Sequence, residues 1–198
     1  FSFKIDKNFK IKNLNFNSKI DLDHLKIDNF LKLKDNFPKI KKNLLLKNQK
    51  IEIDYDKSKT EITGSGLLFL QEKSDIIEYK ITDIKKELIF DINLKISKNP
   101  FIINLLNYKK IEKSILNLNF KGNYNKKKLF FNRILLSENE NNLSIKDFEF
   151  TKNFNIKEIK NIKINYFDKD NIKNSLQIEK FNKDDKLSGG SFNIDKNI

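Results

Sequence analysis

Large apolar residues alternate with polar residues along most of this 198-residue chain. The alternation is clearest in residues 9–16, 51–55, 116–120 and 162–166. Successive side chains of a β-strand point to opposite faces of a sheet, so this two-residue period predicts strands that each have one apolar and one polar face. The sequence therefore predicts an all-β protein.

Short polar turns rich in Asn and Asp separate most of the segments with a strand pattern. Because such turns join neighbouring strands into hairpins, we expect an elongated antiparallel meander. Its one-sided strands would form a curved or twisted open sheet, a β-groove. We expect strands at about 1–6, 9–16, 18–27, 30–34, 44–55, 60–70, 75–82, 87–97, 101–107, 114–121, 128–137, 143–151, 155–166, 172–181 and 187–195.

Two features modify this simple pattern. Residues 44–46 and 134–136 are apolar on both faces, which predicts that the sheet curves so that both faces are covered there. Asn99 and Pro100 precede residues 101–108, where a short helix is the alternative to a strand. We favour the strand, because the neighbouring segments are strands.

We also expect Gly122–Asn125 to form a turn.

The composition makes every apolar position bulky, because Ala, Val, Met, Cys and Trp are absent. Without cysteine the chain forms no disulfide and no thiolate metal site. The net charge is +13, but Arg133 is the single arginine and the lysines are interleaved with 27 acidic residues. Nucleic-acid sites favour clustered charge and arginine, so we expect a solvated basic surface and no nucleic-acid partner.

The candidate chemical groups lack the partners that catalysis or metal binding needs. His24 is the only histidine, and residues 54–58 start like a calcium loop without its glycine or its closing glutamate. Gly64 and Gly66 lie inside a strand pattern, which indicates a bulge or close strand packing rather than a phosphate loop. The carboxylates of 168–170 lie in a turn. We therefore expect no catalytic, cofactor or metal site, and a protein that is not an enzyme.

The apolar faces are then the candidate functional surface. An open trough of Ile, Leu and Phe would expose far more apolar area than a monomer usually shows, so it needs a ligand along its length. Acyl chains are long and featureless, as the trough is, and they require no catalytic group. We expect the lipid-lining residues to be Phe9, Ile11, Ile51, Ile53, Leu116, Leu118, Phe120, Ile162 and Ile164.

Three sequence features resemble the AsmA-like bacterial envelope proteins of the YhdP type and, more distantly, TamB. They are the cadence of residues 9–23, the run from Ile62-Thr-Gly-Ser-Gly66 to Ile81, and Gly189-Gly-Ser-Phe-Asn-Ile-Asp195. The resemblance implies that residues 1–198 are one segment of a longer β-groove protein in the periplasm. A subdivision of the segment near 98–100 is the alternative organisation. It carries no catalytic residues.

The resemblance also implies the partners and the role. They are phospholipid acyl chains, the inner membrane through an anchoring segment outside this chain, and adjoining β segments of the same full-length protein. The role would be to support phospholipid transport to the outer membrane. The alternative is a structural or adhesive β-repeat of a cell-surface protein whose apolar core is closed. If Leu118 faces lipid, Asp at that position should block lipid crosslinking, whereas Asp at Asn117 should not.

Overall fold

The computed structural model confirms the all-β class. Most of the described chain is strand, and its one helical element is a single 3-10 turn. The structure describes residues 2–9, 11–28, 34–125, 128–150, 156–181 and 184–189.

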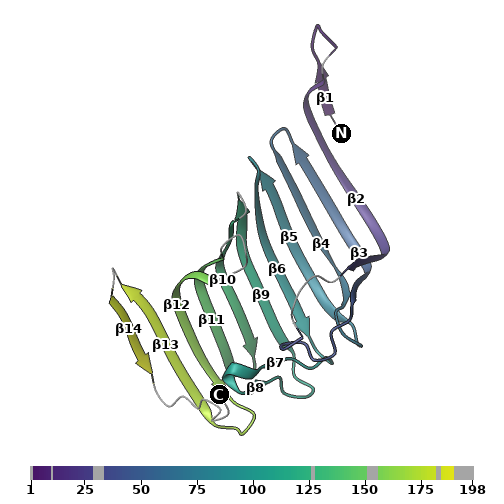
Figure 1. Cartoon of the computed structure of the whole chain (residues 1–198). Coiled ribbons are helices and arrows are strands. Elements are labelled where there is room, and N and C mark those ends of the chain that lie inside the picture. Colours follow the sequence, from purple (N-terminus) through teal and green to yellow (C-terminus); the bar gives the residue numbers. More distant parts are fainter. Residues whose placement is uncertain are drawn as a thin grey trace.

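Twelve strands form one antiparallel sheet in which almost every strand pairs with its neighbours in sequence. Figure 1 shows this sheet as a twisted, open meander with β1 and β14 at its two edges. The strands are β1 (Ser2–Ile5), β2 (Ile11–Asp28), β3 (Asn43–Asp56), β4 (Lys59–Phe69), β5 (Asp75–Ile84), β6 (Glu87–Ile96), β9 (Leu116–Asn125), β10 (Lys128–Glu138), β11 (Asn141–Phe150), β12 (Ile156–Phe167), β13 (Lys173–Phe181) and β14 (Asp184–Gly189).

Residues 97–115 leave the large sheet between β6 and β9. They contain β7 (Ile102–Ile103), the 3-10 turn η1 (Asn104–Leu106) and β8 (Tyr108–Lys109), and β7 pairs with β8 in a second, small sheet. The expected strand at 101–107 is therefore two short strands around a helical turn. Because β6 pairs directly with β9, the large sheet continues across this insertion.

Two expected breaks between strands are wrong. The sequence predicts separate strands at 9–16 and 18–27, but β2 runs unbroken from residue 11 to residue 28. Ser18 lies opposite Ile53, so the two-residue period continues through the polar position. The expected turn at Gly122–Asn125 is the end of β9, where these residues pair with both β6 and β10.

Some expected strands extend beyond the described residues. The expected strand at 30–34 falls almost entirely outside them, as does the part of the expected strand 187–195 that follows Gly189. The other expected strands match observed strands to within a few residues.

Bulges keep the apolar side chains on one face where their spacing in the sequence changes. The pairing of β3 with β4 shifts between Lys47 and Lys50, and Asn48 there has a positive φ of 50°. The pairing of β10 with β9 shifts between Phe131 and Arg133. An extra residue in one strand reverses the alternation beyond it, so the apolar set stays on the same side.

A cap made of residues 34–42 and 97–115 covers one end of the apolar face. The N–H of Ile102 donates to the carbonyl of Asn36 at 3.0 Å, which joins the two cap segments, and the side chain of Gln71 donates to the carbonyl of Pro100 at 2.8 Å. Figure 1 shows β7 and β8 at the lower end of the sheet. The hydrophobic core lies where cap and sheet meet, and it includes Phe37, Leu94, Ile96, Phe101, Leu116, Leu118, Tyr108, Leu136 and Ile164.

Candidate functional site: the apolar face of the sheet

The apolar residues of neighbouring strands form continuous rows across the sheet. Residues that lie directly opposite each other in an antiparallel pair share a face, so the strand register identifies these rows. The central row crosses ten strands through Ile20, Ile51, Gly64, Tyr79, Ile92, Phe120, Ile134, Ile145, Ile162 and Ile178.

A second row lies nearer the cap and contains only Ile and Leu side chains from β5 to β13. Its members are Ile77, Leu94, Leu118, Leu136, Leu143, Ile164 and Leu176. On the other side of the central row, Ile53 begins a third row that continues through Ile62, Ile81, Phe90, Gly122, Phe131 and Phe148. The face is thus apolar both along the strands and across them.

Seven of the nine residues expected to line a lipid groove lie on this one face. They are Ile51, Phe120 and Ile162 in the central row, Leu118 and Ile164 in the second row, Ile53 in the third row, and Leu116 beside Ile96 under the cap. Leu116, Leu118 and Ile164 are buried, whereas Ile51, Ile53, Phe120 and Ile162 are half-buried.

The other two expected residues lie elsewhere. Phe9 is in the turn between β1 and β2, where its φ is 58° and its side chain is 90% exposed. Ile11 begins β2, and its side chain falls outside the described residues. A turn at Phe9 interrupts the alternation that placed both residues in one strand.

The apolar face and the cap enclose a hollow of about 610 Å³, which we call the apolar hollow. Its floor includes Leu94, Leu118 and Leu136 of the second row, and the cap contributes Phe37 and Phe101. The two cap rings are in edge-to-face contact, with centroids 5.1 Å apart. Sequence reasoning missed the cap residues, because no strand alternation marks them.

Phenylalanine rings gather at the uncapped end of the face. Phe131 is at the centre of this group, with ring centroids 5.5 Å from Phe90 and 6.2 Å from Phe148. Gly122 lies opposite both Phe90 and Phe131, and a Cβ there would overlap the backbone carbonyl of Phe130 and lie 2.9 Å from the Phe90 ring. The absence of a side chain at this glycine thus allows the close approach of the β10 backbone and of the Phe90 ring.

A buried carboxylate fastens the cap to the sheet. Glu138, which is 1% exposed, accepts hydrogen bonds from the hydroxyl of Tyr108 at 2.6 Å, from the N–H of Ile111 at 2.9 Å and from the hydroxyl of Ser114. Burial, and then the nearby Glu138 carboxylate, raise the pKa of Tyr108 far above its usual value. The hydroxyl therefore keeps its proton and remains a donor to Glu138.

A second tyrosine fastens the cap on β12. The hydroxyl of Tyr166 donates to the carbonyl of Leu106 at 2.6 Å, and burial raises the pKa of Tyr166 to about 12. The rings of Tyr108 and Tyr166 pack edge to face at 6.0 Å. Two tyrosines from different elements therefore hold the cap in one position.

A third buried group holds the start of the cap. Asp75 accepts a hydrogen bond from the side chain of Asn99 at 2.7 Å, and burial raises the pKa of Asp75. Burial lowers the pKa of Lys110, whose ammonium donates to the carbonyl of Ser97 at 2.8 Å. Neither Asp75 nor Lys110 lines the apolar hollow.

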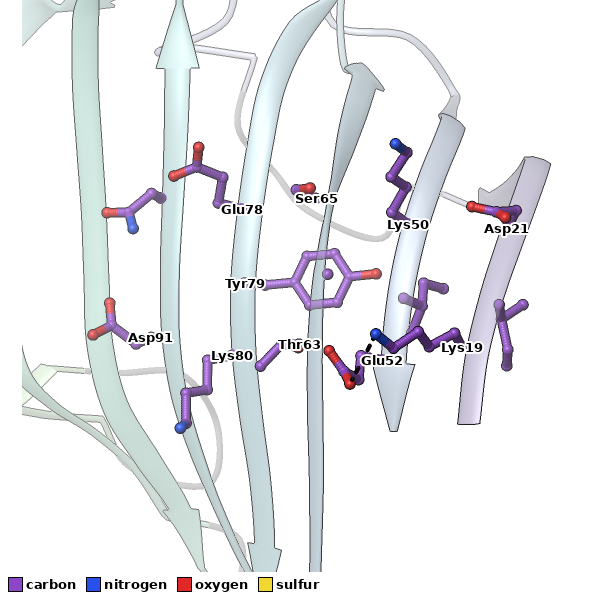
Figure 2. A pocket seen from close by; sticks show the side chains of 14 residues that line it. Lys19, Asp21, Lys50, Glu52, Thr63, Ser65, Glu78, Tyr79, Lys80 and Asp91 are labelled. Carbon is purple, nitrogen blue, oxygen red and sulfur yellow. Dashed lines mark ion pairs between the residues drawn. The ribbon is translucent and has the colours of Figure 1, made fainter. Parts of the chain in front are cut away.

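The opposite face of the sheet is polar and carries a shallow hollow of about 650 Å³. Figure 2 shows the residues that line it, with Lys19 and Glu52 joined as an ion pair at 3.7 Å and with Lys80 and Asp91 at the other side. Four residues of the central row, Ile20, Ile51, Gly64 and Tyr79, also belong to its lining. The lysines and carboxylates of this hollow alternate across the strands. Exposed pairs of this kind contribute little free energy, so this face is best explained as a solvated surface.

Two further structural findings concern metals and membranes. The described residues contain no group of three or more His, Asp or Glu side chains placed to hold a metal ion. No helix in the part of the chain that the structure describes is long and apolar enough to cross a membrane. The single histidine, His24, is exposed on β2.

The chain matches no known family model, and neither curated proteins nor solved structures include a significant match to it.

Proposed function

We propose that this protein binds the acyl chains of phospholipids along the apolar face of its open sheet. The observation that carries the proposal is the apolar hollow, whose lining has fifteen apolar residues and one polar residue, Asn36. Its volume of about 610 Å³ lies within the range of about 300–1,000 Å³ that is usual for sites of small molecules.

The chemistry of the lining favours hydrocarbon over a polar ligand. A polar group that enters the hollow gives up its hydrogen bonds to water and finds almost no partner, which costs roughly 1–3 kcal/mol for each group. A methylene group that enters gains about 0.8 kcal/mol from burial. The rows of Ile and Leu continue from the hollow to β12 and β13, so a bound acyl chain could contact apolar side chains along more of its length.

The wider role in the proposal is support of phospholipid transport to the outer membrane by a periplasmic protein anchored in the inner membrane. The unpaired outer edge of the open sheet supports the idea of a longer protein. Beyond Asn15, the outer edge of β2 pairs with no other strand among the described residues, and Ile20 and Leu25 on that strand are exposed. Adjoining β segments of a longer protein could therefore extend the rows of the apolar face.

Site-specific photocrosslinking tests acyl-chain binding. Phe120 lies in the central row of the apolar face, is half-buried and lines the apolar hollow, so the benzoyl group of p-benzoylphenylalanine at this position can reach a bound acyl chain. We expect this variant, purified without detergent and irradiated, to gain the mass of a phospholipid. The matched control carries the same photoreactive residue at Asn119, which points to the polar face and should gain none.

The alternative function, a structural or adhesive β-repeat with a closed apolar core, is favoured by the cap, which closes one end of the face. Native mass spectrometry distinguishes the two functions. Co-purified phospholipid supports the lipid proposal. Lipid-free protein, together with equal crosslinking from positions 120 and 119, would overturn that proposal in favour of the closed core.

A further inference from the structure

The two cap segments also line a second hollow of about 480 Å³, which we call the lysine hollow. Five lysines line it, together with one carboxylate, that of Glu112. Lysine and arginine make up about a fifth of the whole chain but half of the ten lining residues. The lysines are Lys39, Lys98, Lys109, Lys110 and Lys113.

Two of the five lysines have carboxylate neighbours, and one of these is Lys110, which lies within the electrostatic influence of Glu138, Asp75 and Glu112. Lys39 forms an ion pair with Glu72 at 3.2 Å. By contrast, Lys98, Lys109 and Lys113 are exposed and form no ion pair with any described residue. On the polar face of the sheet, by comparison, Lys80 forms an ion pair with Glu61 at 2.6 Å. The lysine hollow is distinguished by the number of lysines that line one concave site.

Lys110 gives the lysine hollow a fixed cation. Its side chain is buried, and its ammonium donates to the carbonyls of Ser97 at 2.8 Å and Ile111 at 3.1 Å. An ammonium group has three donors, so these two bonds leave one for a ligand. The ammonium groups of Lys98, Lys109 and Lys113 can then donate to an anion that is held by the ammonium of Lys110.

We propose that the lysine hollow binds a phosphate group. Several lysine ammonium groups in one concave site suit an anion with several oxygens, because each ammonium can donate to a different oxygen. This inference does not depend on acyl-chain binding, because a phosphate without a hydrocarbon chain would bind in the same way.

The position of the site adds a link to the apolar hollow. The same two cap segments line both hollows: Phe37 and Phe101 contribute to the apolar hollow, whereas Lys39 and Pro100 contribute to the lysine hollow. An amphiphile with a phosphate headgroup could therefore place its two parts on neighbouring surfaces of the cap. The phosphate would then come from either of two sources, a phospholipid headgroup or a soluble phosphate.

Two probes test the site in the full chain. The first is inorganic phosphate, titrated while backbone amide signals are followed by NMR. The second is a set of vesicles that contain phosphatidylglycerol, with binding measured by sedimentation. We expect a variant in which Lys98, Lys109 and Lys113 are all changed to Gln to weaken binding of at least one probe by about tenfold or more.

The control variant must lose the same charge at another place. Lys57, Lys85 and Lys86 are exposed in hairpin turns, so K57Q/K85Q/K86Q is matched in number and chemistry. We expect this control to bind within about twofold of the natural chain, since exposed lysines away from the hollow contribute only weak, screened attraction. Circular dichroism of both variants checks that the sheet is retained.

The outcomes separate the two sources of phosphate and leave the proposal open to refutation. Saturable shifts confined to residues near 97–113 with inorganic phosphate would support a site for soluble phosphate. Vesicle binding that depends on Lys98, Lys109 and Lys113, without such shifts, would support a headgroup site. Equal losses in the two triple variants would show general attraction to a basic surface and would overturn the proposal.

Discussion

At Gly64, one missing side chain makes room for a ring on the apolar face. Gly64 lies directly opposite Tyr79, and a Cβ added at Gly64 would overlap the end of the Tyr79 ring. Gly64→Ala should therefore force the ring from its place and lower the free energy of unfolding by about 1–3 kcal/mol, the usual cost of overpacking. Denaturant unfolding followed by circular dichroism measures the change.

A double variant identifies the ring as the cause. Tyr79→Ser removes the ring, so Gly64→Ala should cost much less in that background than in the natural chain. Ser65→Ala, which changes the polar face of the same strand, should have little effect. If Gly64→Ala costs the same with and without the ring, backbone conformation rather than packing is the reason for glycine.

A single hydrogen bond from Tyr108 joins the cap to the sheet at Glu138. Tyr108→Phe keeps the ring in the core but removes the donor to the buried carboxylate of Glu138. A hydrogen bond to a charged group contributes about 1.5–3 kcal/mol, so we expect a loss of stability of that size. Tyr124→Phe is the control, because that tyrosine is exposed on β9. Equal denaturation midpoints for the two variants would contradict the proposed role of Tyr108.

At the scale of the elements, the cap has a pH dependence that follows from Asp75. Burial raises its pKa in the folded state above the value in the unfolded chain, so the folded state binds the proton more tightly. The contribution of Asp75 to stability therefore falls as the pH rises from the unfolded pKa through the folded pKa. Asp75→Asn removes this dependence, and the new side chain can still accept from Asn99.

We accordingly expect the Asp75→Asn variant to be more stable than the natural chain at pH 7 and to lose most of this advantage near pH 4. Urea denaturation at the two pH values makes the comparison. Asp83→Asn on the same strand is the control, because that side chain is exposed and should show no such difference. If the Asp75→Asn variant has the same advantage at both pH values, this explanation is contradicted.

The strands were predictable from the sequence because the alternation is local. Ile51, Leu118 and Ile164 lie on one face as expected, since each follows from its immediate neighbours and the pairing of adjacent strands preserves the face. The cap was not predictable. Phe37 and Phe101 meet across more than sixty residues of sequence, and no periodic pattern records that contact.

Bulges and turns explain the remaining differences at this scale. Phe9 continues an apolar cadence in the sequence, but its positive φ places it in a turn, away from the face. Asn48 and Asp147 also have positive φ, and at Asn48 the register of β3 with β4 shifts. Asn and Asp occur throughout this chain, so composition alone does not show which of them adopt this conformation.

Over the whole molecule, stability should vary along the sheet, because each strand pairs only with its two neighbours. A linear array of this kind can open from its ends without breaking its centre. The buried core and the cap lie against β6, β9, β10 and β12, whereas most side chains of β2 are exposed. The free energy of local opening should therefore be highest in the middle of the sheet.

Hydrogen exchange measured by mass spectrometry tests this gradient. We expect peptides from β6 and β9 to exchange at least about tenfold more slowly than peptides from β1 and the first half of β2, since a difference of about 1.4 kcal/mol in opening free energy is tenfold in rate. Tyr108→Phe should shrink the gap by speeding exchange in β9 and β10, where Glu138 lies, and should leave β2 unchanged. One uniform exchange rate would instead show that the sheet unfolds as a single cooperative unit.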